Sequence, residues 1–176
     1  DVFFVYAINL TYHRSTLSII QNLRHSFPKV PIAILENTQS VTAYALENIQ
    51  HEFYDAGATY VVMGEPEERG VKLIRHILSK GKYEELLKVD GIGYRKDGIS
   101  MYTSAAQKIE NLDSLPFAAW ELFPVKNYWK LKYAHGPLTA NQYLPILTSR
   151  GCPYSCRFCV IPETNDLKWR YRSAIN

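Results

Sequence analysis

Apolar and polar positions follow two different periods along the first half of the chain. Short apolar runs bounded by polar or turn residues predict buried strands at Val2–Ile8, Pro31–Leu35 and Thr59–Met63. Between and after these runs, apolar residues recur every three or four positions and predict helices over residues 15–27, 41–54 and 65–79. Short buried strands that alternate with helices indicate an α/β fold with a doubly wound, Rossmann-like parallel sheet that carries helices on both faces.

The turn before the last of these helices has the sequence Gly64-Glu-Pro-Glu-Glu68. Glycine permits the turn, proline suits the first turn of a helix, and glutamates favour the positive end of the helix dipole. These preferences predict a structural role for the segment.

The strand and helix alternation stops after Gly81. Lys96-Asp97-Gly98 lies between two short apolar stretches and predicts a β-hairpin. The segment that follows is too aromatic for a free linker and predicts an ordered connector. Gln142–Leu147 is again a short apolar run and predicts a strand, with Pro145 indicating an edge or a first strand.

All three cysteines of the chain, Cys152, Cys156 and Cys159, follow this run within one window of the sequence. Thiolates are the soft ligands that zinc and iron-sulfur clusters prefer. A structural zinc site normally has four protein ligands, and the nearest preceding histidine is His135, with none after the cysteines. The residues alone therefore leave three possibilities: reduced thiols, a zinc site with a borrowed ligand, or a cluster with three ligated irons and one open iron. The cluster fits best.

Composition narrows the function classes. The chain is 47% hydrophobic and 21% charged, as expected for ordinary globular protein. It has no apolar run long enough to span a membrane, and a formal charge of +3 is too small to indicate a nucleic-acid partner. Crowded thiols favour a reducing compartment, so we expect a cytoplasmic protein. A basic group around the cysteines predicts solvated surface or a site for the phosphates or carboxylates of a ligand, and comprises Arg157, Lys168, Arg170 and Arg172.

The segment Thr148-Ser-Arg-Gly-Cys-Pro-Tyr-Ser-Cys-Arg-Phe-Cys159 resembles the cluster loop of the radical S-adenosylmethionine (SAM) enzymes. The resemblance implies that Cys152, Cys156 and Cys159 bind a 4Fe-4S cluster and that Phe158 lies near the adenine of SAM. In that family the reduced cluster cleaves SAM to a 5'-deoxyadenosyl radical. It also implies an external electron donor such as flavodoxin or ferredoxin.

The chain combines a Rossmann-like domain, a Gly-Glu-x-Glu turn, a glycine-rich hairpin, an Asp113-Ser-Leu-Pro-Phe117 connector and the cysteine motif. This combination resembles radical SAM proteins with an amino-terminal cobalamin-binding domain. The resemblance divides the chain into a cobalamin-binding-like domain over 1–80, a hairpin and connector over 81–140, and the start of a partial TIM-type barrel over 141–176. Because one strand cannot make a barrel, and the chain opens inside an apolar run, we expect a fragment of a longer protein, truncated at both ends and lacking the first strand of its domain.

The resemblance leaves cobalamin binding open. Members of the class often place a histidine of a DxHxxG loop on cobalt, and that loop lies in the missing region. They usually carry Gly-Gly where this chain has Leu35-Glu36, and side chains there would crowd a bound cofactor. His13 follows a strand end and is the one candidate cobalt ligand.

Three function classes are compatible with these features. The first is a radical SAM enzyme of the cobalamin-domain class, which implies methyl transfer, cyclisation or rearrangement on a small-molecule, lipid or peptide substrate. The second is a radical SAM methylthiotransferase acting on RNA or a ribosomal protein, but that family uses extra cysteines in its front domain and residues 1–151 have none. The third is a nonenzymatic module that binds a cluster or a corrinoid.

Overall fold

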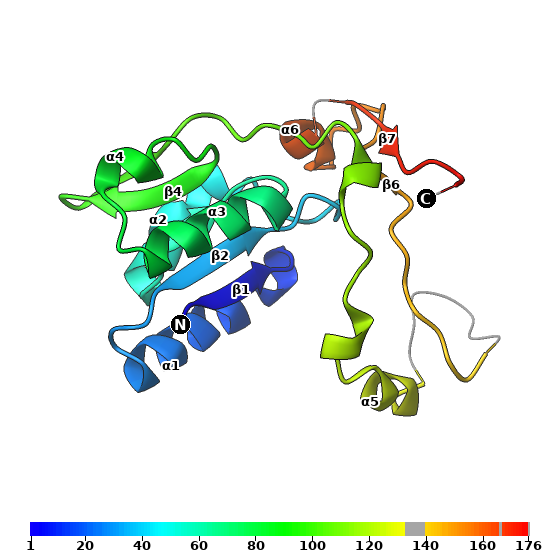
Figure 1. Ribbon diagram of the computed structural model, residues 1–176, viewed down its shortest axis with the longest axis horizontal. Helices are drawn as coiled ribbons and strands as arrows, with labels where there is room; N and C mark the ends of the chain where they lie inside the picture. The colour runs from blue at the N-terminus through cyan, green and yellow to red at the C-terminus, as the bar shows by residue number, and fades with distance from the viewer. Residues whose placement is uncertain (133–139, 166, 176) are drawn as a thin grey trace.

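The computed structural model describes residues 1–132, 140–165 and 167–175. Part of the predicted connector, residues 133–139 with His135, lies outside the described residues. The molecule consists of an α/β unit at the amino-terminal end, an extended connector, and a small two-stranded sheet that carries the cysteines (Figure 1).

The main sheet has five strands in the order β1-β2-β3-β4-β5. Strands β1 (Phe3–Ala7), β2 (Ile32–Glu36) and β3 (Tyr60–Val62) are parallel to one another. The predicted parallel strands are therefore confirmed, each within two residues of its expected ends. Their carboxyl ends face the connector and the cysteine-bearing sheet (Figure 1).

Helices cover both faces of this sheet, as the alternation predicts. On one face, α1 (His13–Ser26) and α2 (Leu46–Ala56) place Ile20 and Phe53 against residues such as Ile34. On the other face, α3 (Pro66–Leu78) and α4 (Tyr83–Leu86) pack against Ala33 and Val62, which alternate with the residues of the first face. The sheet is thus buried on both sides.

Helix α2 begins at Leu46, later than the sequence pattern predicts. The amide of Leu46 donates a hydrogen bond of 2.8 Å to the carboxylate of Glu36, at the end of β2. A buried side chain from another element therefore satisfies one of the free amides of the helix start, and residues 41–45 form turn and coil.

The predicted hairpin is confirmed as β4 (Ile92–Lys96) and β5 (Ile99–Tyr102). Its two turn residues, Asp97 and Gly98, have φ values of 51° and 79°, as a tight turn between twisted strands requires. Strand β4 pairs antiparallel with β3, so the hairpin extends the parallel sheet.

The connector leaves the main sheet as one limb, and a second limb, residues 140–148, leads to β6 (Figure 1). Its described helical turns are η2 (Leu112–Ser114), η3 (Trp120–Leu122) and α5 (Val125–Lys130). The indole nitrogen of Trp129 donates a hydrogen bond of 2.7 Å to the carbonyl of Tyr143, which joins the two limbs.

The predicted strand at Gln142–Leu147 is wrong. Those residues form no strand, and pairing begins at β6 (Ser149–Arg150), which is antiparallel to β7 (Arg170–Tyr171). Pro145 has no amide to donate to a ladder, and Ile146 is 78% exposed, so the apolar run is not the buried strand its composition indicated. Between β6 and β7 lies one short helix, α6 (Ile161–Asn165). The assignment of residues 141–176 to a barrel stays a prediction.

Candidate functional site

The three cysteines lie on the loop that leaves β6 and runs to α6. We call residues 151–160 the cysteine loop. Its thiols are free; Cys156 is exposed, and Cys152 and Cys159 are partly buried. The amide of Cys159 donates to the carbonyl of Cys156 at 3.0 Å, which makes a tight turn between the last two thiols. Phe158 is 82% exposed and therefore available to a ligand rather than committed to a core.

The donor chemistry of the loop fits a thiolate-bound cluster, because three reduced sulfurs lie on one short segment without secondary structure. Their positions are not yet those of a closed coordination shell: within residues 1–132, 140–165 and 167–175, no three His, Cys, Asp or Glu side chains are grouped closely enough to hold a metal ion. Cluster binding at this loop would require its side chains to turn inward.

Gly151 allows the loop to start where it does. Its φ is +84°, and a Cβ atom on it would lie 1.9 Å from the backbone carbonyl oxygen of Lys168. No side-chain rotation could relieve a contact between backbone and Cβ. Glycine is therefore required between β6 and Cys152 for the segment before β7 to pass this closely.

Glu65, in the turn before α3, is buried and accepts hydrogen bonds from three other parts of the chain. Arg170 of β7 donates to both of its carboxylate oxygens, at 2.9 and 2.7 Å. The amide of Ile109 in the connector donates at 2.8 Å. Arg150 of β6 approaches the same carboxylate at 3.3 Å. Glu65 and Arg170 are only 3% and 4% exposed.

The pKa of Glu65 reflects this environment. Burial alone would raise it, but the hydrogen bonds from Arg170 and the Ile109 amide, with the charges of Arg170 and Arg150, outweigh burial and hold the pKa below its ordinary value. The carboxylate is therefore ionised at neutral pH, as a partner for two arginines must be.

Two further contacts, one directly before the cysteine loop and one at its last residue, join this segment to the α/β unit. Arg150 forms an ion pair with Glu67 in the first turn of α3. The amide of Val160, directly after Cys159, donates to the carbonyl of Val41 at 3.3 Å. The loop is thus attached on both sides of its three thiols.

The Asp113-Ser-Leu-Pro-Phe117 segment holds the chain just after β7. The carboxylate of Asp113 accepts a hydrogen bond of 2.9 Å from the amide of Ser173. The guanidinium of Arg172 donates to the carbonyl of Leu115 at 3.1 Å and lies 5.8 Å from the ring centroid of Phe117. The motif therefore belongs to the structural support of the cysteine-bearing sheet.

Most of the basic group around the cysteines is used within the protein. Arg170 binds Glu65, Arg172 binds the connector carbonyls, and Lys168 forms an exposed ion pair with Glu110. Lys168 is exposed, as the solvated-surface interpretation predicts, whereas Arg170 is buried against Glu65 and Arg172 is held by the connector. Arg157 is the exposed cation of the loop itself. No local pattern indicates the partners of these residues, because each partner lies at least 50 positions away.

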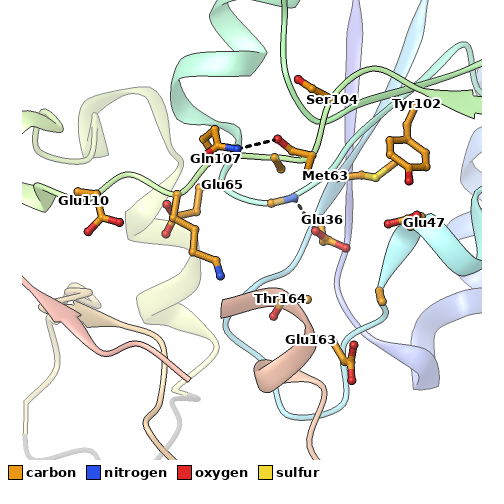
Figure 2. Close-up of a pocket in the computed structure, with 15 residues that line it drawn as sticks. Glu36, Glu47, Met63, Glu65, Tyr102, Ser104, Gln107, Glu110, Glu163 and Thr164 are labelled. Carbon is orange, nitrogen blue, oxygen red and sulfur yellow. Dashed lines mark hydrogen bonds between the residues drawn. The ribbon is translucent and has the colours of Figure 1, made fainter. Parts of the chain in front are cut away.

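A cavity of about 430 Å³ lies between the carboxyl edge of the sheet, the start of the connector and α6 (Figure 2). Ligands of open α/β sheets bind at this edge. Glu36 and Met63 line it from the strand ends, and Glu163 and Thr164 line it from α6, a few residues after Cys159. Sequence reasoning missed this juxtaposition of the cysteine loop and the strand ends.

Glu36, at the position where cobalamin domains usually carry glycine, lines this cavity and is 7% exposed. Its carboxylate accepts hydrogen bonds from the amides of Leu46 and Gly64, and burial, partly offset by these bonds, raises its pKa. The side chain thus fills space that the glycine would leave free.

His13, the one candidate cobalt ligand, lies at the start of α1. Its Nδ1 is 3.2 Å from the hydroxyl of Tyr44, and its Nε2 is 2.9 Å from the carboxylate of Glu52. Both ring nitrogens have partners, and the ring packs edge-on against Tyr44 and Phe53. As placed, neither His13 nor Glu36 fits a bound corrinoid, and we assign no step to cobalamin.

No helix of the described residues is long and apolar enough to cross a membrane.

No protein-family model matches the chain. Among curated proteins, it is 36% identical over 113 residues to the anaerobic magnesium-protoporphyrin IX monomethyl ester cyclase of Synechocystis, which covers 64% of this chain and 20% of that protein. It is 31% identical over 113 residues to an uncharacterized methyltransferase of Pyrococcus horikoshii, covering 64% of this chain and 22% of that protein. It is 35% identical over 63 residues to the cytidylyl-2-hydroxyethylphosphonate methyltransferase of Streptomyces wedmorensis, covering 35% and 12%. The chain spans about a fifth of the length of the first two of these relatives.

Proposed function

We propose that this chain is part of a radical SAM enzyme of the class that carries a cobalamin-binding-type domain. The observation that carries the proposal is the cysteine loop: three free thiols, spaced three and then two residues apart, attached at the carboxyl edge of an α/β sheet. When bound, a 4Fe-4S cluster with one open iron supplies the electron that cleaves SAM reductively. In this proposal Cys152, Cys156 and Cys159 hold the cluster, and Phe158 contacts the adenine.

The names of the relatives support the reaction class at a coarse level. One is a cyclase and two are methyltransferases, which agrees with methyl transfer or cyclisation on an unreactive carbon. A small-molecule, lipid or peptide substrate and an external reductant such as flavodoxin or ferredoxin belong to the proposal for the whole protein.

The test is anaerobic reconstitution of the full-length protein with iron and sulfide, followed by iron and sulfide analysis and the optical spectrum. We expect about four irons per chain, and loss of the cluster in Cys152→Ala, Cys156→Ala and Cys159→Ala, because each thiolate holds a different iron. Ser155→Ala, on the same loop, is the matched control and should retain the cluster. Stoichiometric zinc without iron would contradict the proposal and favour the zinc site.

The same preparation separates the two alternatives. Residues 1–151 have no cysteine to hold the second cluster of a methylthiotransferase, so about eight irons per protein would require further cysteines outside these residues and would favour that alternative. A cluster that forms but gives no 5'-deoxyadenosine with SAM and a low-potential reductant would favour a nonenzymatic binding module.

A further inference from the structure

We propose that Glu65 positions the cysteine loop against the carboxyl edge of the sheet. The inference rests on the proposed function in one respect: it assumes that the three cysteines are iron ligands. Glu65 itself touches no cysteine in any contact of the described residues; it acts through Arg150 and Arg170.

The first step of the argument is where the two arginines lie. Arg150 is the second residue of β6, and Arg170 is the first residue of β7, so they stand before and after the segment with all three thiols. They also face each other in the β6–β7 register. The carboxylate of Glu65 therefore binds one residue before the cysteine loop, Arg150, and one residue after it, Arg170.

The second step is the geometry of the contact. A bidentate pair between a guanidinium and a carboxylate fixes orientation as well as distance. The Arg170–Glu65 pair has this form, with side chains 3% and 2% exposed. Glu65 lies between Gly64 and Pro66, directly before α3, so its backbone position is set by the α/β unit. The pair therefore orients Arg170, and with it β7, relative to the main sheet.

The third step concerns energy. Burying an ion pair costs desolvation that its attraction often does no more than balance, so such a pair is poor evidence for stability alone. Its effect here is to select one arrangement, because only a carboxylate at position 65 satisfies Arg170, Arg150 and the Ile109 amide together.

The fourth step is what the arrangement places together. Glu65 lines the cavity at the strand ends, and α6, a few residues after Cys159, closes the other side of it (Figure 2). Glu65 thereby sets the distance between the thiols and the cavity in which a ligand of the α/β unit would lie. The sequence alone predicted only a helix-start role for this glutamate.

The test is Glu65→Gln in the full-length protein, first without iron. We expect amide hydrogen exchange at Val160 and Arg172, whose amides bond to Val41 and Thr148, to become about tenfold faster or more. Alkylation of the partly buried Cys152 and Cys159 should accelerate in parallel. Glu110→Gln is the matched control, because it removes an exposed ion pair to Lys168 in the same region, and it should change neither rate.

The second readout is spectroscopic. After reconstitution, the reduced cluster of Glu65→Gln should give altered electron paramagnetic resonance g-values or lose the change on SAM addition, while Glu110→Gln should match the wild type. Glu65→Asp, which keeps the charge on a shorter side chain, should restore part of the wild-type signal. A merely structural residue would lower the melting temperature and leave the signal of the folded fraction unchanged.

If Glu65→Gln does not fold, the double variant Glu65→Gln/Arg170→Met removes both charges of the pair, and faster exchange in this folded variant supports the inference. Exchange and alkylation rates equal to those of the wild type, in either variant, would overturn it. Failure of the wild type to take up iron would contradict the proposed function, but the iron-free exchange experiment would still decide the role of Glu65.

Discussion

The carboxylate of Glu65 is buried and ionised at once, because guanidinium groups and a backbone amide replace the water it loses. Three partners converge on it: Arg170 and Arg150 from the cysteine-bearing sheet, and the Ile109 amide from the connector. Its backbone carbonyl also accepts a hydrogen bond from Arg69 of α3. One residue of the turn before α3 thus connects the α/β unit, the connector and the cysteine-bearing sheet.

Acid should weaken the protein through Glu65. Its pKa in the folded state is below the ordinary value, so the native protein binds fewer protons than the unfolded chain. The stabilisation is fully present above the unfolded pKa of glutamate and is lost as pH falls through the folded pKa. Arginines stay charged throughout this range. We expect the unfolding free energy of the wild type to fall more than that of Glu65→Gln on acidification from neutral pH, because only the wild type must protonate this paired carboxylate.

Thermal unfolding followed by circular dichroism at a series of pH values measures this difference. Glu36 has a raised pKa and contributes with the opposite sign, but it is present in both proteins and cancels in the comparison. If the unfolding free energies of wild type and variant changed equally with pH, the pairing of an ionised Glu65 with its arginines would be contradicted.

At the scale of elements, the parallel strands and the hairpin were predictable because their signals are local. An apolar run is enough to predict each of the strands around Ile34 and Val61, and the turn residues Asp97-Gly98 are enough to predict the hairpin. The start of α2 and the strand expected at Gln142–Leu147 were not, because both depend on distant partners. Leu46 starts its helix where Glu36 accepts its amide, and the apolar run has no neighbouring strand to pair with in the part of the chain that the structure describes.

The β6–β7 pair should be sensitive to one methyl group. Gly151→Ala places a Cβ 1.9 Å from the carbonyl oxygen of Lys168 at a φ of +84°, so the backbone must move and the two strands must separate. We expect a loss of about 2–4 kcal/mol in unfolding free energy, from strain and overpacking together. Cysteine alkylation should accelerate as well.

Gly98→Ala is the matched control for this change. Its φ of +79° imposes a similar backbone cost, but no atom lies within 4 Å of the new Cβ, so only about 1–2 kcal/mol should be lost. Denaturant unfolding of both variants measures the difference. Equal losses would mean that the close approach of Lys168 does not constrain the cysteine loop.

At the scale of the whole molecule, the cysteines of the candidate site could be predicted from the sequence, but the contacts that hold their loop could not. Cys152, Cys156 and Cys159 can be proposed as cluster ligands from the sequence, because their spacing is local. Their support is hidden because Glu65 lies 105 positions from Arg170, and nothing in either neighbourhood indicates the other. The same holds for the cavity, which α6 and the strand ends form only after folding.

The exposure of the cysteine loop leads to the last prediction. Cys156 is exposed and Phe158 is 82% exposed, so the residues that the structure describes do not exclude water from a cluster or from a bound sulfonium at this loop. Productive cleavage of SAM needs the reacting groups held in a fixed, water-excluded geometry. We therefore expect the isolated chain, reconstituted with iron and sulfide, to give no 5'-deoxyadenosine with SAM and a low-potential reductant under anoxia, and the full-length protein to give it. Turnover by the isolated chain would place the whole SAM site within these residues, and would show that the exposed loop closes on its own.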